Sequence, residues 1–178
     1  MKLSNFISGV INGITATALI AVVGTQLYAS DHSWSRKEIV RITHNDVYCL
    51  RQNIFFEARN QTVEGQVAVA WVTLNRLDNS IYPDTICGVV KQAKRDSSGK
   101  VIRNMCHFSW YCDGKSDKPK NTKAYAKALM IAHGVYHGNL DDFVEGATHY
   151  HAHYVTPEWA KTKTMTVRIN DHIFYRWE

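Results

Sequence analysis

Prolines, glycines and several catalytic motifs are scarce or missing in this chain of 178 residues. With only 3 prolines and 10 glycines, a collagen-like or low-complexity chain is excluded. No G-x-S-x-G motif and no glycine-rich phosphate loop occur, so serine-nucleophile and nucleotide-binding enzymes lack their usual signatures. Hydrophobic residues nevertheless make up 45% and aromatic residues 11% of the chain, which is enough to bury a core and excludes disorder over most of the length.

The chain also lacks a strong charge imbalance. It carries 21 Lys+Arg against 16 Asp+Glu, a formal net charge of +5 that is spread along the sequence. A mild, dispersed basic excess suits an anionic polymer without requiring nucleic acid. We therefore predict no nucleic-acid partner.

No charged residue occurs between Lys2 and Asp31, and residues 6–29 are mostly apolar or small. At about 1.5 Å per helical residue, this hydrophobic helix spans a bilayer core of roughly 30 Å. The lysine that precedes it is a weak signal for keeping the N-terminus in the cytoplasm. We predict that residues 6–29 are a signal anchor in the inner membrane, and that residues 30–178 form a domain exported to the periplasm or cell wall.

Two other interpretations of this segment stay open. The residues L-Y-A before Ser30 resemble the small-residue cleavage site of a secretory signal peptide, which would remove residues 1–29. A buried core helix is the third interpretation, and the length of the apolar run favours it least.

All four cysteines, at positions 49, 87, 106 and 112, lie in the exported part. An even count in an oxidising compartment predicts one or two disulfides. Three full pairings are possible, and the sequence does not choose among them. No C-x-x-C motif occurs, which disfavours a zinc site built from the cysteines.

Two groups of histidines have a spacing that can hold Zn²⁺. His149, His151 and His153 alternate, and His133 and His137 lie four residues apart in a predicted helix. However, no H-E-x-x-H motif occurs, and no acidic residue lies between His133 and His137. Surface or hydrogen-bonded core histidines are the simpler interpretation, so we predict no metal and no cofactor.

Hydrophobic periodicity and turn residues predict an α+β domain that is mostly helical, with a small β-hairpin. The expected elements are a helix over 46–59 capped by Asp46, a core helix over 63–77 capped by Thr62, a short helix over 85–91, a polar hairpin or loop over 93–104, an irregular aromatic loop over 106–119, a helix over 122–137 capped by Thr122, and a hairpin of residues 164–169 and 172–175.

Glu57 is the candidate catalytic residue that the pattern singles out. In the first predicted helix, Val47, Leu50, Ile54 and Ala58 form an apolar stripe, and Glu57 lies beside it. A carboxyl group there is partly desolvated, which disfavours its charged form and raises its pKa. The structural alternative is a boundary glutamate paired with a nearby base.

Four sequence blocks together resemble the SleB-type cell-wall hydrolases, a family of spore-cortex-lytic enzymes and relatives carried by bacteria and their phages. The blocks are NIFFEAR (53–59) with EGQVAVA (64–70) and LNR (74–76), YPDTICGVVKQ (82–92), FSW (108–110) with CDG (112–114), and GATHYH (146–151) with PEW (157–159) and HIFYR (172–176). Each block is modest alone, but their order and number make the resemblance specific.

The resemblance implies a lysozyme-like fold, peptidoglycan glycan strands as substrate, and Glu57 as the catalytic acid. It further implies lytic transglycosylase chemistry at the bond between N-acetylmuramic acid and N-acetylglucosamine, in which one carboxyl group serves both steps. An ordinary glycosidase would need a second carboxylate about 5 to 9 Å away. Asp84, Asp113 and Glu145 are candidates for that role, and nothing local distinguishes one of them.

Substrate-binding residues follow from the matching blocks. They are Gln66, Ser109, Trp110, Tyr150 and Trp159. Core packing is the alternative for the two tryptophans. Two departures from the family pattern stand out: His107 replaces the usual glutamine before F-S-W and brings a group that titrates near neutrality, and Asn170 replaces a frequent glycine, although asparagine tolerates a left-handed turn.

A peptidoglycan-cleaving enzyme without an obligate protein partner is thus the function that the sequence favours. A zinc-dependent amidase or peptidoglycan peptidase is the alternative enzyme class, and a catalytically inert wall-binding module is the alternative outside enzymes. The marginal hydrophobic segment also suggests a phage endolysin of the signal-anchor-release kind, which acts in host cell lysis.

Overall fold

The computed structural model describes residues 36–177, with side chains from residue 44 onward. The predicted membrane segment, residues 6–29, and the domain boundary at residue 29 lie outside the described residues. Within 36–177, no helix is both long enough and apolar enough to cross a membrane.

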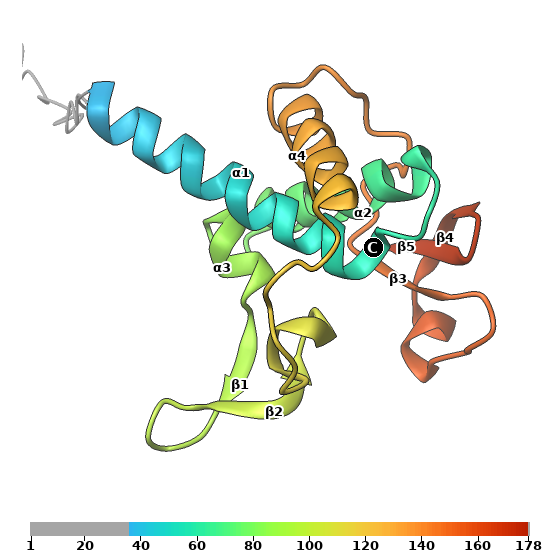
Figure 1. Cartoon of the computed structure of the whole chain (residues 1–178). Coiled ribbons are helices and arrows are strands. Elements are labelled where there is room, and N and C mark those ends of the chain that lie inside the picture. The colour runs from blue at the N-terminus through green and yellow to red at the C-terminus, as the bar shows by residue number, and fades with distance from the viewer. Residues whose placement is uncertain (1–35, 178) are drawn as a thin grey trace, which may run out of the picture. The chain divides into compact units, whose positions relative to one another are not determined.

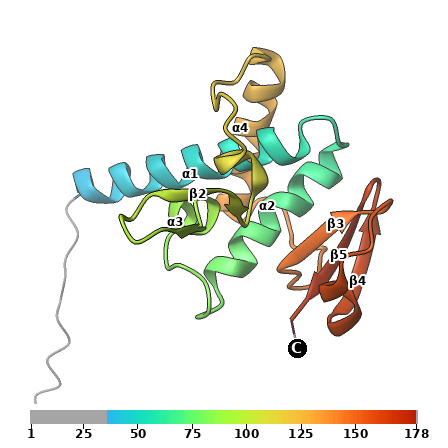
Figure 2. The same cartoon turned by 90° about the horizontal axis from the view of Figure 1, so that it is seen from below.

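Three helices make up the larger part of the fold. α1 (Arg36–Ala58), α2 (Val63–Leu77) and α4 (Thr122–Tyr136) pack against one another, and the short α3 (Ile86–Val90) contacts α1 and α2. Figures 1 and 2 show the sheet formed by β3, β4 and β5 beside α2, well away from the β1–β2 hairpin.

The core lies between these helices, where the sequence pattern placed it. The predicted stripe of α1 is buried, because Leu50 and Ile54 are 0% exposed. The middle of α2 is buried on every side, from Val67 to Val72 apart from Trp71, which is partly exposed. The prediction of a core helix capped by Thr62 is therefore confirmed, and the Thr62 hydroxyl accepts a hydrogen bond from the Gly65 N–H at 3.3 Å.

Two predicted helix starts are wrong. α1 begins at Arg36, so Asp46 lies inside the helix and does not cap it. Residues 36–45 include no proline or glycine that would stop the helix. In α4 the cap is Asn121, whose side chain accepts a hydrogen bond from the Ala124 N–H at 3.0 Å, while Thr122 is the first helical residue.

The predicted surface hairpin is formed by β1 (Ala93–Arg95) and β2 (Val101–Cys106). The Asp96 carboxylate closes its turn by accepting hydrogen bonds from the Ser98 and Lys100 N–H groups. The following aromatic segment is irregular, as expected, apart from one turn of 3₁₀ helix, η1 (Ser109–Cys112).

A three-stranded antiparallel sheet has the order β3-β5-β4. The hairpin of β4 (Thr164–Ile169) and β5 (His172–Arg176) was predicted, and its turn contains Asn170 at φ 48°, which confirms that asparagine takes up this left-handed position. The third strand, β3 (His149–Ala152), was missed, as was the short 3₁₀ helix η2 (Glu158–Thr162). β3 has only four residues, too few to show the alternation of a strand, and its partner β5 does not follow it directly in the sequence.

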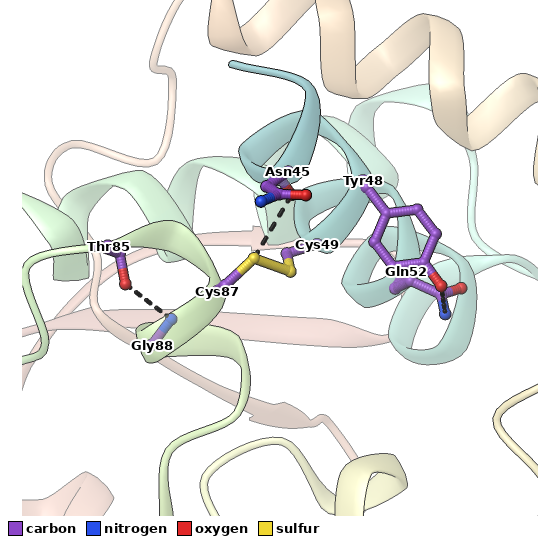
Figure 3. The surroundings of a disulfide bond; sticks show 7 residues. All are labelled: Asn45, Tyr48, Cys49, Gln52, Thr85, Cys87 and Gly88. Carbon is purple, nitrogen blue, oxygen red and sulfur yellow. Dashed lines mark hydrogen bonds between the residues drawn. A yellow bond between two sulfur atoms is a disulfide. The ribbon is translucent and has the colours of Figure 1, made fainter. Parts of the chain in front are cut away.

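Two disulfides are present, so the predicted bridges are confirmed and the pairing is decided. Cys49 in α1 is bonded to Cys87 in α3, and Cys106 in β2 is bonded to Cys112 in η1. Figure 3 shows the first bridge, which ties α3 to the middle of α1. The second bridge closes the aromatic segment onto the hairpin.

Replacing both Cys49 and Cys87 by serine should lower the free energy of unfolding by about 3–4 kcal/mol, because the bridge joins positions 38 residues apart. Denaturant unfolding of the full chain measures this. The matched variant, Cys106→Ser with Cys112→Ser, opens a bridge of only 6 residues separation, so about 2 kcal/mol is expected. A larger loss in the second variant than in the first would contradict the entropic interpretation.

Candidate active site

Glu57 and Tyr150 meet where the helical part contacts the sheet. Glu57 lies in the last turn of α1, and Tyr150 lies on β3. The Tyr150 hydroxyl donates a hydrogen bond to Glu57 Oε2 at 2.8 Å. The stripe on α1 and the pairing of β3 with β5 thus bring together two sequence-predicted site residues that are 93 positions apart.

Burial raises the pKa of the Glu57 carboxyl group, as the sequence pattern predicted. The hydrogen bond from Tyr150 and the charge of Arg76 oppose part of this rise, because both favour the carboxylate. Burial and the nearby Glu57 also raise the pKa of Tyr150 well above its ordinary value, so the phenol stays protonated and remains a donor. The pair therefore combines a carboxyl group whose pKa is raised with a phenol that donates a hydrogen bond to it.

Arg76, at the end of α2, is a buried cation beside this pair. It is 6% exposed, and its Nε donates a hydrogen bond to the Thr148 carbonyl oxygen at 2.7 Å. Its guanidinium also lies over the Phe108 ring, 4.7 Å from the centroid. No ion pair joins Arg76 to a carboxylate among the described residues, so its electrostatic effect is available to the Glu57 carboxylate when that forms.

Two cavities share Phe56, Glu57 and Arg59 in their walls. The larger, of about 570 Å³, extends toward η1 and the segment 113–121. The smaller, of about 230 Å³, extends toward the ends of β3 and β5. Glu57 therefore lies in the wall of both cavities.

Trp110 and Ser109 line the larger cavity together with Glu57. The Trp110 ring stacks on Phe56, with 4.7 Å between centroids, and its indole N–H donates to Asn53 Oδ1 at 3.0 Å. Asn53 in turn donates to the Thr73 hydroxyl at 3.0 Å. Trp110 is thus both a packed core residue, 8% exposed, and a wall of the cavity.

Gln66 and Trp159 lie elsewhere. The Gln66 side chain is buried in α2 and donates to the Gln61 carbonyl oxygen at 2.9 Å. Trp159 packs against His149 and His151, with 5.3 and 5.5 Å between ring centroids. These histidines alternate with Tyr150 along β3, so Trp159 lies on the sheet face opposite Glu57. Neither residue lines the two cavities that contain Glu57.

The histidines form no metal cluster among residues whose side chains the structure describes. His133 and His137 stack on α4, 5.7 Å apart. Burial and the Arg76 charge lower the pKa of His107, and burial with several positive charges lowers the pKa of His149 to about 4. Both rings are therefore neutral at neutral pH, and His107 does not add a charge to the site there.

Of the acidic residues considered for a second carboxylate, only Asp113 lines a cavity with Glu57, and Asp117 joins it there. Asp113 is held by its neighbour Lys115, whose N–H donates to Oδ1 at 2.8 Å and whose ammonium lies 3.5 Å from Oδ2. Burial and the charge of Asp113 raise the pKa of Asp117. Asp84 and Glu145 line neither cavity.

The family model described as Cell Wall Hydrolase matches residues 60–175. The chain belongs to this family. The resemblance found in the sequence is therefore confirmed, and so is the helix-rich α+β fold, because the fold matches solved structures of the same kind. The catalytic domain of the Bacillus cereus SleB protein aligns with a TM-score of 0.53 and 26% identity, over 75% of this chain and 91% of that one.

A second solved structure is the catalytic domain of the germination-specific lytic transglycosylase SleB from Bacillus anthracis. It aligns with a TM-score of 0.55 and 25% identity, over 82% of this chain and 98% of that one. Spore cortex-lytic enzymes from Oceanobacillus iheyensis and Bacillus subtilis are 29% and 28% identical over 74% of this chain. The chain spans 42% and 38% of their lengths, less than half in each case.

Three residues near Glu57 had no role assigned from the sequence. Asn53 lies one helical turn before Glu57 on the same face of α1, a spacing that could have pointed to it. Arg76 belongs to a matching block, but its approach to Glu57 depends on the packing of α2. Asp117 carried no signal, because it lies in a segment without regular secondary structure.

Replacing Tyr150 by phenylalanine should raise the pKa of Glu57 further, because the lost hydrogen bond stabilised the carboxylate. NMR titration of the Glu57 carboxyl carbon measures this directly. Tyr136→Phe, which alters a phenol on α4, is the control and should leave the titration unchanged. An unchanged or lower Glu57 pKa in Tyr150→Phe would show that the hydrogen bond does not stabilise the Glu57 carboxylate.

Proposed function

We propose that this chain is a peptidoglycan lytic transglycosylase that cleaves between N-acetylmuramic acid and N-acetylglucosamine. The observation that carries the proposal is the position of Glu57, a half-buried acid with a raised pKa that lines two cavities. Membership of the cell wall hydrolase family and the fold shared with a solved lytic transglycosylase domain support it.

In the first step, Glu57 protonates the glycosidic oxygen of the leaving sugar. Tyr150 donates to Oε2, so Oε2 acts as the acceptor oxygen and the carboxyl proton resides on Oε1. The bond between the muramyl C1 and the leaving oxygen then breaks, and positive charge develops on the muramyl ring. The carboxylate that remains is stabilised by the Tyr150 donor and by the buried Arg76 charge.

In the second step, the same carboxylate acts as a base. It removes the proton from the muramyl C6 hydroxyl, whose oxygen attacks C1 and closes a 1,6-anhydro ring. Glu57 regains its proton, so the cycle needs neither water nor a second carboxylate. In the larger cavity, Trp110 supplies an aromatic wall for the sugar rings and Ser109 supplies a hydroxyl group.

Hydrolysis is the second candidate reaction, because Asp113 and Asp117 line the same cavity as Glu57. Either aspartate would then activate a water molecule or stabilise the muramyl cation. Since Lys115 occupies both oxygens of Asp113, Asp117 is the better candidate for this role.

Replacing Glu57 by glutamine should reduce peptidoglycan cleavage about 10²- to 10⁴-fold, which is the usual contribution of a positioned acid. Mass spectrometry of purified sacculi digested by the full chain identifies the bond broken. Anhydro-muropeptides that disappear with Glu57→Gln are the expected result. Reducing-end muropeptides would assign hydrolysis, whereas free stem peptides whose release a chelator stops would assign a zinc amidase and refute the proposal.

The same variant should keep its fold. The pKa of Glu57 is raised above its ordinary value of 4.5. Between that value and the raised pKa, the native state binds more protons than the unfolded state, so it loses stability as the pH rises. Glutamine carries no charge and can still accept the Tyr150 hydrogen bond. We therefore expect Glu57→Gln to be at least as stable as the wild type at neutral pH, with the difference shrinking as the pH falls toward 4.5 and absent well below it. Cleavage of sacculi by this variant at the wild-type rate would contradict the catalytic role of Glu57.

We also propose that residues 6–29 hold the enzyme at the inner membrane as a signal anchor, which suits a phage endolysin that is released later. Support comes from the uncharged apolar run between Lys2 and Asp31. Membrane fractionation of the full chain, with mass measurement of its N-terminus, tests this. Recovery of the intact chain from the membrane first and from the soluble periplasm later is expected. Complete cleavage after Ala29 would identify a signal peptide instead.

A further inference from the structure

The two cavities that meet at Glu57 differ in charge. The smaller one is lined by Arg59, Asp171 and His172, and burial lowers the pKa of His172, so its wall is close to neutral at neutral pH. The larger one is lined by four cationic side chains: Arg59, Lys115, Lys118 and Lys120. Asp113 and Asp117 are its only acidic residues apart from Glu57. This side of the groove therefore carries an excess of positive charge.

Three of these cations are available to a ligand. Lys115 is already paired with Asp113. Within residues 44–177, the side-chain nitrogen atoms of Arg59, Lys118 and Lys120 make no hydrogen bond or ion pair. Burial raises the pKa of Asp117, the remaining acid on this wall, and burial raises that of Glu57. A raised pKa disfavours the negatively charged form of both acids, so neither shift helps to compensate the charge of the lysines.

The start of the segment that carries the lysines, at residues 113 and 114, is held by the hairpin. Arg103 on β2 donates from Nε and Nη2 to the Asp113 carbonyl oxygen, at 3.2 and 3.0 Å. The adjacent Gly114 has φ +80°, and a Cβ atom there would meet the Arg103 guanidinium at 3.0 Å. Together with the Cys106–Cys112 bridge, these contacts attach the cationic wall to the hairpin.

The chemistry of the substrate indicates what this wall binds. In peptidoglycan, the sugar backbone is neutral where each lactyl group is amide-linked, and the negative charges are the carboxylates of the stem peptides. A neutral cavity suits sugars alone, whereas a cationic cavity suits sugars that bear a peptide. We propose that the larger cavity receives the stem peptide of the glycan strand, and that Lys118 and Lys120 pair with its carboxylates.

This proposal rests on the proposed function for its substrate, so it is tested by binding as well as by cleavage. The probes are soluble muropeptide fragments, used as isolated and after their carboxyl groups have been converted to amides with carbodiimide and ammonium. The two probes have the same sugars and the same peptide length, and differ in charge. Binding to the full chain carrying Glu57→Gln is measured by calorimetry, and cleavage by the otherwise wild-type chain is measured with the same probes.

The expected result is that amidation weakens binding about 3- to 10-fold, as the loss of two exposed ion pairs would. In the double variant Lys118→Gln with Lys120→Gln, the difference in affinity between the two probes should nearly vanish. The control, Lys94→Gln with Lys100→Gln, removes the same charge from the exposed hairpin and should keep the full difference. High salt should also reduce the difference, because it screens exposed charges.

Equal binding of the two probes to the parent chain, or an equal difference in the Lys118/Lys120 and Lys94/Lys100 variants, would overturn the proposal. A failure of the proposed function has a separate signature. In that case the otherwise wild-type chain would leave both probes uncleaved, while the binding measurements would still report whether the cationic wall recognises the stem-peptide carboxylates.

Discussion

The hydrogen bond between Tyr150 and Glu57 is the contact on which the site depends, because it joins the helical part of the fold to the sheet at the proposed reacting group. A carboxyl group in such a buried place is difficult to ionise, yet the proposed reaction needs it as an acid first and as a base second. Burial provides the first state by raising the pKa of Glu57. Tyr150 and Arg76 stabilise the second state, because both favour the carboxylate.

Arg76 is unusual in this arrangement. A buried guanidinium is costly unless it is compensated, and here its compensation comes from the Thr148 carbonyl oxygen and from aromatic rings. An acidic side chain paired with Arg76 would cancel the charge of the guanidinium locally. Without one among the described residues, the positive charge acts on Glu57 and on Tyr150. It also adds to burial in lowering the pKa of His107 and His149.

The β1–β2 hairpin and its disulfide give the groove its second property, which is a difference in charge between its two sides. The bridge and Arg103 place the segment after η1 beside Glu57, although that segment has no regular structure of its own. On the other side, the Asn170 side chain donates to the Thr62 hydroxyl, a contact that glycine in this position could not make. This contact connects the β4–β5 turn with the start of α2, next to the smaller cavity.

Local pattern by itself determined much of this protein. The apolar period of α1 placed Glu57 beside the core, the all-apolar middle of α2 identified it as the central helix, and turn residues located both hairpins. Ordered blocks identified the family. Tertiary structure alone decided the cysteine pairing, the strand β3 with Tyr150 on its inner face, the approach of Arg76 and the place of Asp117. It also separated Trp159 from the groove that holds Trp110. The physical reason is range: helix periods and caps act over a few residues, whereas the site is made by contacts such as Glu57 with Tyr150, 93 positions apart, which exist only once helices and sheet have packed.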